Sequence, residues 1–278
     1  MTAPAQSSSA TARGSGKATA IILARAGSKG VPGKNTRDIA GRPCIAWTID
    51  HAQRASSVGL VAVSSDDPRA LEIATSMGAL ALARSPALAT DTARIDDAAR
   101  EAVLQLEHQC GAGGGTGVSP VPAANQPIVI LYANVPVRPA GLIDRAVELL
   151  VRTGCDSVQS YQPVGKHHPW WTARMDARTG LVRPWEGKVL NHGVFRRQDL
   201  PPAYIPDGGI IALTREALFC RIKGVRPGPH AFLGTDRRGI ISPQGSVVDI
   251  DSPIDLLVAD AVLRSRSMGR RGGSATPC

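Results

Sequence analysis

The stretch IILARAGSKGVPGKN, residues 21–35, joins an apolar segment to a loop rich in glycine and positive charge. The apolar residues predict a buried strand, and the loop after it carries Arg25, Lys29 and Lys34 among three glycines. Glycines let a backbone approach phosphate oxygens, and cations neutralise them. The stretch therefore predicts an α/β protein that holds a nucleoside triphosphate at the end of its first strand. The alternative, a basic surface turn, leaves three cations beside a buried strand end unexplained.

The spacing within this loop excludes two common phosphate-binding motifs. A Walker A loop needs four residues between its glycines and a Ser or Thr after its lysine. Here five residues separate Gly27 from Gly33, and Asn35 follows Lys34. A dinucleotide fingerprint is excluded because no Gly-x-Gly-x-x-Gly follows the strand. The loop must therefore belong to another class of triphosphate site.

The length of 278 residues and the hydrophobic content of 43% suit one large α/β domain. We expect this domain to span residues 18–266, between disordered tails at 1–17 and 267–278. The chain has no apolar run of 18 residues and no signal-peptide core at its N-terminus, so we expect no membrane partner and a cytoplasmic protein. The five cysteines are widely spaced, which predicts neither a zinc site nor a disulfide framework.

The net charge of +9 raises the possibility of a nucleic-acid partner. Six of the excess charges lie near the ends, which leaves 9 − 6, or about +3, on the predicted body. No basic cluster interleaved with aromatic residues is present there, so we expect no nucleic-acid partner. The six terminal cations are Arg13, Lys17, Arg264, Arg266, Arg270 and Arg271.

From Ala18 onward, predicted strands alternate with predicted helices, which indicates a mainly parallel sheet between two helical layers. Ligands of such sheets bind at the carboxyl ends of the strands, where the first loop lies. Residues 109–126 are rich in Gly and Pro and predict a flexible insertion, and residues 163–205 lose helical periodicity. We expect strands at 20–24, 60–64, 127–132, 156–162, 208–213 and 246–251, and helices at 43–56, 68–78, 91–108, 142–152, 215–219 and from 253.

Two aspartates near the C-terminus provide negative charge for the same site. Asp249 and Asp251 are two residues apart on a predicted strand, so their carboxylates are expected to project to one face. Two carboxylates at a strand end can hold Mg²⁺ beside nucleotide phosphates, although a solvated strand end is the alternative. Asp255 follows Ser252 and Pro253 and is expected to cap the next helix rather than bind metal.

The opening loop and the Asp-x-Asp segment resemble those of the acylneuraminate cytidylyltransferases, over roughly residues 18–263. This resemblance implies a Rossmann-like nucleotidyltransferase fold in three layers, with a small dimerisation arm at 163–205. It implies transfer of CMP from CTP to the anomeric hydroxyl of a nonulosonic acid, with release of pyrophosphate. Mg²⁺ is the implied cofactor, CTP and a sugar acid are the implied ligands, and a homodimer is the implied assembly.

The resemblance also implies which residues bind the nucleotide. Arg84 and the run Leu88-Ala89-Thr90-Asp91-Thr92 stand where the family has an Arg and then Leu-Ala-Ser/Thr-Asp-Thr. Asp91 could equally be the N-cap of the following helix. Arg25 and Lys34 are the expected catalytic cations. The full expected nucleotide set is Leu23, Ala24, Arg25, Gly27, Ser28, Lys29, Lys34, Asn35, Arg84 and Asp91.

Two further segments match the family less closely and concern the sugar. Residues 131–138 read LYANVPVR where the family commonly has Leu-Gln-Pro-Thr-Ser-Pro-Leu-Arg, and Asp207 replaces a usual Asn. Arg197 is the expected partner of the sugar carboxylate, because a guanidinium can bind a carboxylate through two hydrogen bonds. These departures place the identity of the sugar acid in question. The expected sugar-binding residues are Tyr132, Asn134, Arg197, Gln198 and Asp207.

Three alternatives remain open. The chain could be a sugar nucleotidyltransferase for another sugar or nucleotide, although relatives that activate 3-deoxy-manno-octulosonate usually have Ser-Thr-Arg at residues 28–30. It could be a non-catalytic nucleotide-binding relative, against which the paired aspartates argue. It could also be a basic nucleic-acid binder, against which the position of the excess charge near the ends argues. The pair His167-His168 could bind zinc, but no third ligand is suitably spaced, so we expect it to pack in the arm.

Overall fold

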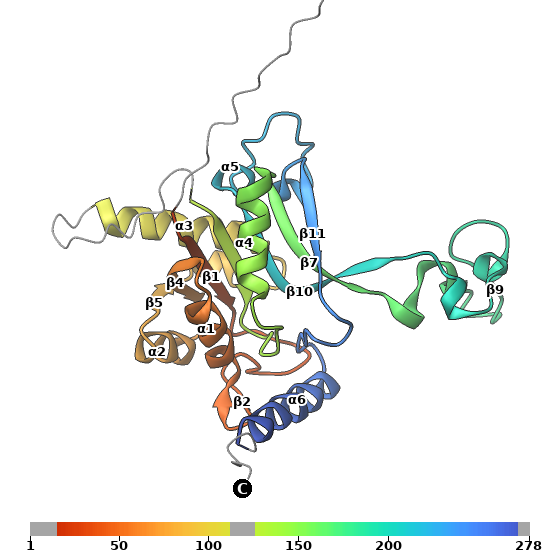
Figure 1. Ribbon diagram of the computed structural model, residues 1–278, viewed down its shortest axis with the longest axis horizontal. Helices are drawn as coiled ribbons and strands as arrows, with labels where there is room; N and C mark the ends of the chain where they lie inside the picture. Colours follow the sequence, from red (N-terminus) through yellow and green to blue (C-terminus); the bar gives the residue numbers. More distant parts are fainter. Residues whose placement is uncertain (1–15, 112–125, 272–278) are drawn as a thin grey trace, which may run out of the picture.

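The computed structural model describes residues 16–111 and 126–271, with side chains placed up to Ser267. Seven strands form the central sheet in the order β11-β7-β10-β6-β1-β4-β5 (Figure 1). Only β10 runs against its neighbours β6 and β7, so the sheet is mainly parallel, as predicted. The strands are β1 Ala18–Ala24, β4 Val58–Ser65, β5 Leu80–Ala83, β6 Ile128–Tyr132, β7 Ser157–Pro163, β10 Tyr204–Leu213 and β11 Arg237–Ile241.

Helices cover both faces of the sheet and confirm the three-layer architecture (Figure 1). Side chains of β1 alternate between the layers: Ile22 packs among residues of α1, α2 and α4, whereas Ile21 packs among residues of α3 and α5. All seven residues of β1 are buried, because the strand lies in the middle of the sheet. The helices are α1 Cys44–Arg54, α2 Pro68–Ser76, α3 Ile95–Gly111, α4 Leu142–Thr153 and α5 Arg215–Leu218.

A third apolar cluster lies at the carboxyl end of the sheet and fixes the loop that follows β1. Val31 and Ile39 of that loop are buried with Ile250 and with Leu263 of the last helix, α6 Pro253–Arg271. The two short strands β2 Asp38–Ile39 and β3 Arg42–Pro43 form a hairpin beside α6. The beginning and the end of the domain therefore share one core.

An arm projects from the sheet between β7 and β10 (Figure 1). It occupies the predicted excursion and contains the antiparallel pair β8 Ala173–Met175 and β9 Val182–Pro184. His168 is buried at its base, where Nδ1 accepts from the Trp170 N–H at 3.1 Å and Nε2 donates to Pro201 O at 3.0 Å. Both ring nitrogens are thus occupied, which favours packing over zinc binding. Short 3₁₀ turns complete the arm at Gly165–His167, Pro169–Trp171, Leu190–Gly193 and Arg197–Asp199.

Several boundaries differ from the sequence expectations. The predicted strand at 246–251 is wrong: this segment makes an isolated bridge between Val248 and Val137, and the Ile250 N–H donates to Asn134 O at 2.9 Å. It passes the end of the sheet instead of adding to it. Helix α3 begins at Ile95, so Asp91 is not its N-cap. Strands β5 and β11 were not anticipated, because four or five residues of mostly exposed β structure carry little periodic signal.

The predicted tail and insertion lie partly outside the described residues. Helix α6 continues to Arg271, five residues beyond the expected boundary, so residues 267–271 belong to a helix rather than to the expected tail. Residues 109–111 end α3, and the rest of the predicted insertion, 112–125, falls outside the described part. Within the described residues, no helix is long and apolar enough to cross a membrane.

Candidate active site

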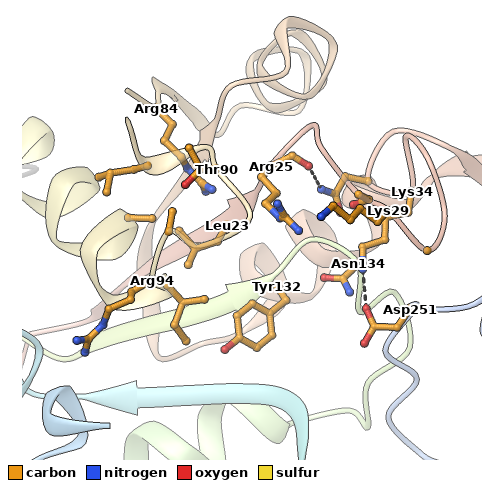
Figure 2. Close-up of a pocket in the computed structure, with 17 residues that line it drawn as sticks. Leu23, Arg25, Lys29, Lys34, Arg84, Thr90, Arg94, Tyr132, Asn134 and Asp251 are labelled. Carbon is orange, nitrogen blue, oxygen red and sulfur yellow. Dashed lines mark hydrogen bonds and ion pairs between the residues drawn. The ribbon is translucent and has the colours of Figure 1, made fainter. Parts of the chain in front are cut away.

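A cavity of about 300 Å³ opens at the carboxyl ends of β1 and β6 (Figure 2). The chain leaves β1 for β4 on one side, whereas β6 flanks β1 on the other, so the cavity lies where the strand order reverses. Ligands of open α/β sheets bind at such a point. The lining residues are Leu23, Arg25, Ser28, Lys29, Gly30, Lys34, Asn35, Arg84, Leu88, Thr90, Ala93, Arg94, Ile95, Ala98, Tyr132, Asn134 and Asp251.

Two of the loop cations share one carboxylate. Arg25 Nη1 lies 2.5 Å from Asp91 Oδ1, and Lys29 Nζ lies 2.6 Å from Asp91 Oδ2. The hydrogen bonds from Lys29 and Arg25 lower the pKa of Asp91. All three side chains are at least one-third exposed, so the cluster is solvated and its ion pairs add little stability. An incoming polyanion can replace Asp91 as the partner of both cations.

Lys34 is held differently, since only 14% of its side chain is exposed. Its Nζ donates to Ile250 O at 2.6 Å and to Asp251 Oδ1 at 2.7 Å (Figure 2). A Cβ at Gly30 would lie 2.1 Å from Asp251 O, so the loop approaches this segment more closely than any other residue type allows. The loop after β1 and the segment just before α6, with Ile250 and Asp251, therefore form one wall of the cavity.

Asn35 and Arg84 are the buried polar groups of the cavity. Asn35 Nδ2 donates to Arg25 O at 2.9 Å, but its buried Oδ1 has no partner among the described residues. A buried acceptor without a donor is costly, and this one is open to a donor on a ligand in the cavity. Arg84 is 8% exposed and donates to Ser64 O at 2.7 Å and Ser64 Oγ at 3.1 Å. Burial lowers the pKa of Arg84, and these hydrogen bonds fix the direction of its guanidinium.

Asp249 and Asp251 differ in their surroundings although they are close in sequence. Burial, with repulsion from Asp251, raises the pKa of Asp249 to about 6, whereas the Asp251 side chain is 75% exposed. A buried carboxylate repelled by a second one is a site that a divalent cation would relieve, so these residues fit Mg²⁺. Within the described residues, no group of three His, Cys, Asp or Glu side chains could hold a metal ion. Phosphate or water oxygens would have to complete the coordination.

The segment after β6 forms the floor of the cavity. Asn134 Nδ2 donates to Asp249 Oδ1 and, at 3.2 Å, to Ile250 O. The fully buried Arg138 fixes this segment by donating to Val135 O, to Tyr132 O at 3.1 Å and to Thr48 Oγ1 at 3.0 Å. Burial lowers the pKa of Arg138 to about 10, so it remains a cation at neutral pH and holds the floor in place.

Three of the expected sugar-binding residues lie outside this cavity lining. Arg197 and Gln198 are on the arm, where Arg197 Nη2 donates to Gln244 Oε1 at 3.3 Å. Asp207 is buried in β10, and its Oδ1 accepts from the Ser160 hydroxyl and from the Gly209 N–H at 2.9 Å. Its Oδ2 has no partner within the part of the chain that the structure describes. The expected nucleotide residues Ala24, Gly27 and Asp91 and the expected metal ligand Asp249 adjoin the lining without belonging to it.

Part of the lining was not predicted from the sequence. Arg94 is the charged residue among those missed, and it binds Asp96 through two hydrogen bonds of 3.0 and 2.8 Å. Asp96 is 1% exposed, so Arg94 is anchored at the start of α3. The bidentate geometry has no sequence signature beyond the proximity of an Arg to an Asp. The other missed residues are Gly30, Ala93, Ile95 and Ala98, whereas Leu88 and Thr90 belong to the run that the resemblance assigned to the nucleotide site.

Comparisons with known proteins match this chain to cytidylyltransferases. A family model described as cytidylyltransferase matches residues 19–113. The chain is 31% identical over 202 residues to an N-acylneuraminate cytidylyltransferase of Streptococcus agalactiae, covering 72% of this chain and 44% of that protein. It therefore spans less than half the length of this curated relative. It is 28% identical over 245 residues to the CMP-N,N'-diacetyllegionaminic acid synthase of Legionella pneumophila, covering 88% of this chain and 95% of the relative.

The solved structures support the fold. A CMP:2-keto-3-deoxy-manno-octonic acid synthetase complexed with CTP superposes with a TM-score of 0.63 at 17% identity. The match covers 90% of this chain and 99% of that one. At this level of identity the likeness concerns architecture alone, and it confirms the nucleotidyltransferase fold expected from the sequence.

The raised pKa of Asp249 makes a prediction about stability. Its folded pKa, about 6, exceeds its ordinary value of 3.8, so the folded state binds more protons between these values and the ionised carboxylate opposes folding above pH 6. Without divalent cations at pH 8, Asp249→Asn should raise the free energy of unfolding by about 1–3 kcal/mol. The gain should vanish below pH 4. Denaturant unfolding at both pH values measures it.

Asp251→Asn is the matched control, because it removes the partner of Lys34 and should give no such gain. A variant Asp249→Asn that is less stable than the natural protein at pH 8 would contradict the assigned burial of this carboxylate.

Proposed function

The chain belongs to the acylneuraminate cytidylyltransferase family, and on this premise we propose that it transfers CMP from CTP to the anomeric hydroxyl of a nonulosonic acid and releases pyrophosphate. The main observation in support of this proposal is that Lys34 Nζ donates hydrogen bonds to Ile250 O and to Asp251 Oδ1. This contact joins a cationic, glycine-rich loop to a pair of carboxylates at the end of β1. A triphosphate site that also has a place for a metal ion is the arrangement that nucleotidyl transfer needs.

The proposed nucleotide site uses the cations of the first loop. Arg25 and Lys29 exchange Asp91 for phosphate oxygens, because a triphosphate carries more charge than one carboxylate. Arg25 and Lys34 are best placed to stabilise the charge that develops as the attacking hydroxyl reaches the α-phosphorus in line and pyrophosphate departs. The unpartnered Oδ1 of Asn35 suits a donor on the base or the ribose, with Arg84 alongside.

The carboxylates supply the other half of the chemistry. Asp249 and Asp251 would hold Mg²⁺, which when bound neutralises phosphate charge and favours deprotonation of the attacking hydroxyl. Asn134 orients Asp249 by donating to its Oδ1. Arg138 fixes the carbonyls on either side of Asn134 and so keeps that donor in place.

The acceptor is proposed to bind above Tyr132 and Asn134, on the floor of the cavity. Arg197, Gln198 and Asp207 remain proposed sugar contacts, although they lie outside the lining described above. The named substrates of the relatives, an acylneuraminate and a diacetyllegionaminic acid, are both nine-carbon sugar acids. A different sugar acid is the second candidate, because Asn134 and Asp207 depart from the family pattern.

The arm supports a homodimer. Large apolar side chains stand exposed on it, among them Phe195 at 83%, Met175 at 69% and Val189 at 61%. Exposed apolar residues gathered on one projecting element mark an interaction surface. We place this dimer in the cytoplasm, where CTP is present and where the free, buried thiols of Cys44 and Cys155 remain reduced.

Replacement of Lys34 tests the catalytic assignment. Lys34→Ala should keep the fold but lower kcat roughly 10²–10³-fold, because a preorganised charge near the transition state is lost. Pyrophosphate release with CTP, Mg²⁺ and N-acetylneuraminate measures the change. Lys223→Ala removes an exposed lysine outside the cavity and should leave turnover unaltered. Equal rates for both variants would refute the assignment.

A substitution on the arm tests the homodimer. Phe195→Ser should weaken self-association about tenfold or more, as expected for an aromatic residue at the centre of an interface. Sedimentation velocity over a concentration series measures this. Leu104→Ser removes a side chain on α3 that is 50% exposed and should leave the sedimentation unchanged. A monomeric natural protein, or a Phe195→Ser variant that dimerises normally, would contradict the proposal.

A further inference from the structure

A second basic cavity lies away from the candidate active site, where α1, the start of α4 and α6 meet. Two adjoining hollows of about 390 and 240 Å³ share His51, Arg54 and Arg266. The larger reaches the first residues of α4, and the smaller reaches Arg42 and Trp47. None of these residues lines the candidate active site. Segments that are more than 200 residues apart in sequence thus converge on one groove.

The two carboxylates that line this groove bind partners other than Arg266. Asp50 Oδ2 serves both Arg54 at 2.8 Å and Arg42 at 3.4 Å. Asp144 accepts from the Ser57 N–H at 2.8 Å and the Ser57 hydroxyl at 2.7 Å. Among the described residues, four guanidinium groups line the two hollows against two carboxylates, which leaves an excess of two positive charges; they belong to Arg42, Arg54, Arg138 and Arg266.

Of the two excess charges, that of Arg138 is buried and bonded to carbonyls and Thr48, and that of Arg266 is accessible. Among the described residues Arg266 has no ion pair, and Nη1 donates only to the carbonyl of Arg138, at 3.2 Å. By contrast, Arg264 on the same helix lies 2.6 Å from Asp260. Arg266 is exposed at the mouth of the groove. Its guanidinium is free to bind an anion through its remaining donors.

The other walls of the groove also favour the binding of an anion. Helix α4 begins at Gly141 without a side-chain cap, so its first N–H groups add positive potential on the side of the larger hollow. His51 Nε2 donates to Pro136 O at 3.3 Å. Burial and the charges of Arg138 and Arg266 lower the pKa of His51 to about 4, so at neutral pH it is an uncharged reporter inside a positive field.

We infer that this groove is a second anion site, which binds a phosphate-bearing small molecule through Arg266, Arg54 and the start of α4. Phosphate fits best because guanidinium groups bind it through paired hydrogen bonds and because it carries more charge than a carboxylate. Inorganic phosphate and pyrophosphate are the two available sources. The inference does not depend on the proposed function, because the site lies outside the candidate active site.

The ring resonances of His51 test the inference directly. The full chain is labelled with ¹⁵N, and His51 is assigned among the six histidines by His51→Gln. Phosphate and pyrophosphate are added separately, without divalent cations. We expect a saturable shift of the His51 signals with at least one of the two anions. The anion with the smaller dissociation constant is then the ligand that the groove prefers. A shift that does not saturate with either anion would overturn the inference.

Variants assign the shift to the groove. Arg266→Ala should raise the dissociation constant about tenfold, as expected for the loss of one charge-assisted contact. Arg264→Ala, on the same helix but outside the groove, should leave it unchanged. Lys34→Ala should also leave it unchanged, because that residue belongs to the other cavity. An unaltered constant in Arg266→Ala, or a lost shift in Lys34→Ala, would contradict the inference.

Discussion

The site depends on the contact of Lys34 with Ile250 O and Asp251, at 2.6 and 2.7 Å. A lysine with little solvent exposure is costly unless its charge is compensated, and here a carbonyl and a carboxylate compensate it. The contact draws the loop after β1 onto the segment before α6. Gly30 allows this close approach because it has no Cβ. The apolar cluster of Val31, Ile250 and Leu263 beneath it stabilises the same junction.

A second constraint is the balance of charge below the cavity. Arg138 is fully buried without an ion pair among the described residues, and its hydrogen bonds run to main-chain carbonyls and to Thr48. Its charge and that of Lys34 partly offset the effect of burial on the pKa of Asp249. The floor of the cavity is therefore rigid and close to neutral, whereas its loop wall is cationic. This difference in charge between the floor and the loop wall suits a ligand that has one highly charged end and one weakly charged end.

The sequence predicted the features that depend on local patterns. The strand expected at 20–24 and the helices expected at 68–78 and 142–152 lie close to where they were expected, because each has a local cause. These causes are the apolar run of β1, the proline at the start of α2 and the glycine after α4. Features that depend on tertiary contacts escaped prediction. The apolar residues around Asp249 predicted a strand at 246–251, but this segment packs at the end of the sheet instead. No local pattern could reveal that Arg94 is anchored on Asp96, or that Arg197 lies outside the cavity.

The central claim is that the first loop and the paired aspartates together form a CTP site that is coupled to a nonulosonic acid. Pyrophosphate release tests it most directly, with Mg²⁺ and each of CTP, UTP, ATP and GTP against a panel of nonulosonic and octulosonic acids. The account predicts release with CTP and a nine-carbon acid only. Release with another nucleotide, or with CTP and an octulosonic acid alone, would contradict it. If no combination releases pyrophosphate although CTP binds, the catalytic claim is contradicted. The chain would then be a nucleotide-binding protein with this fold.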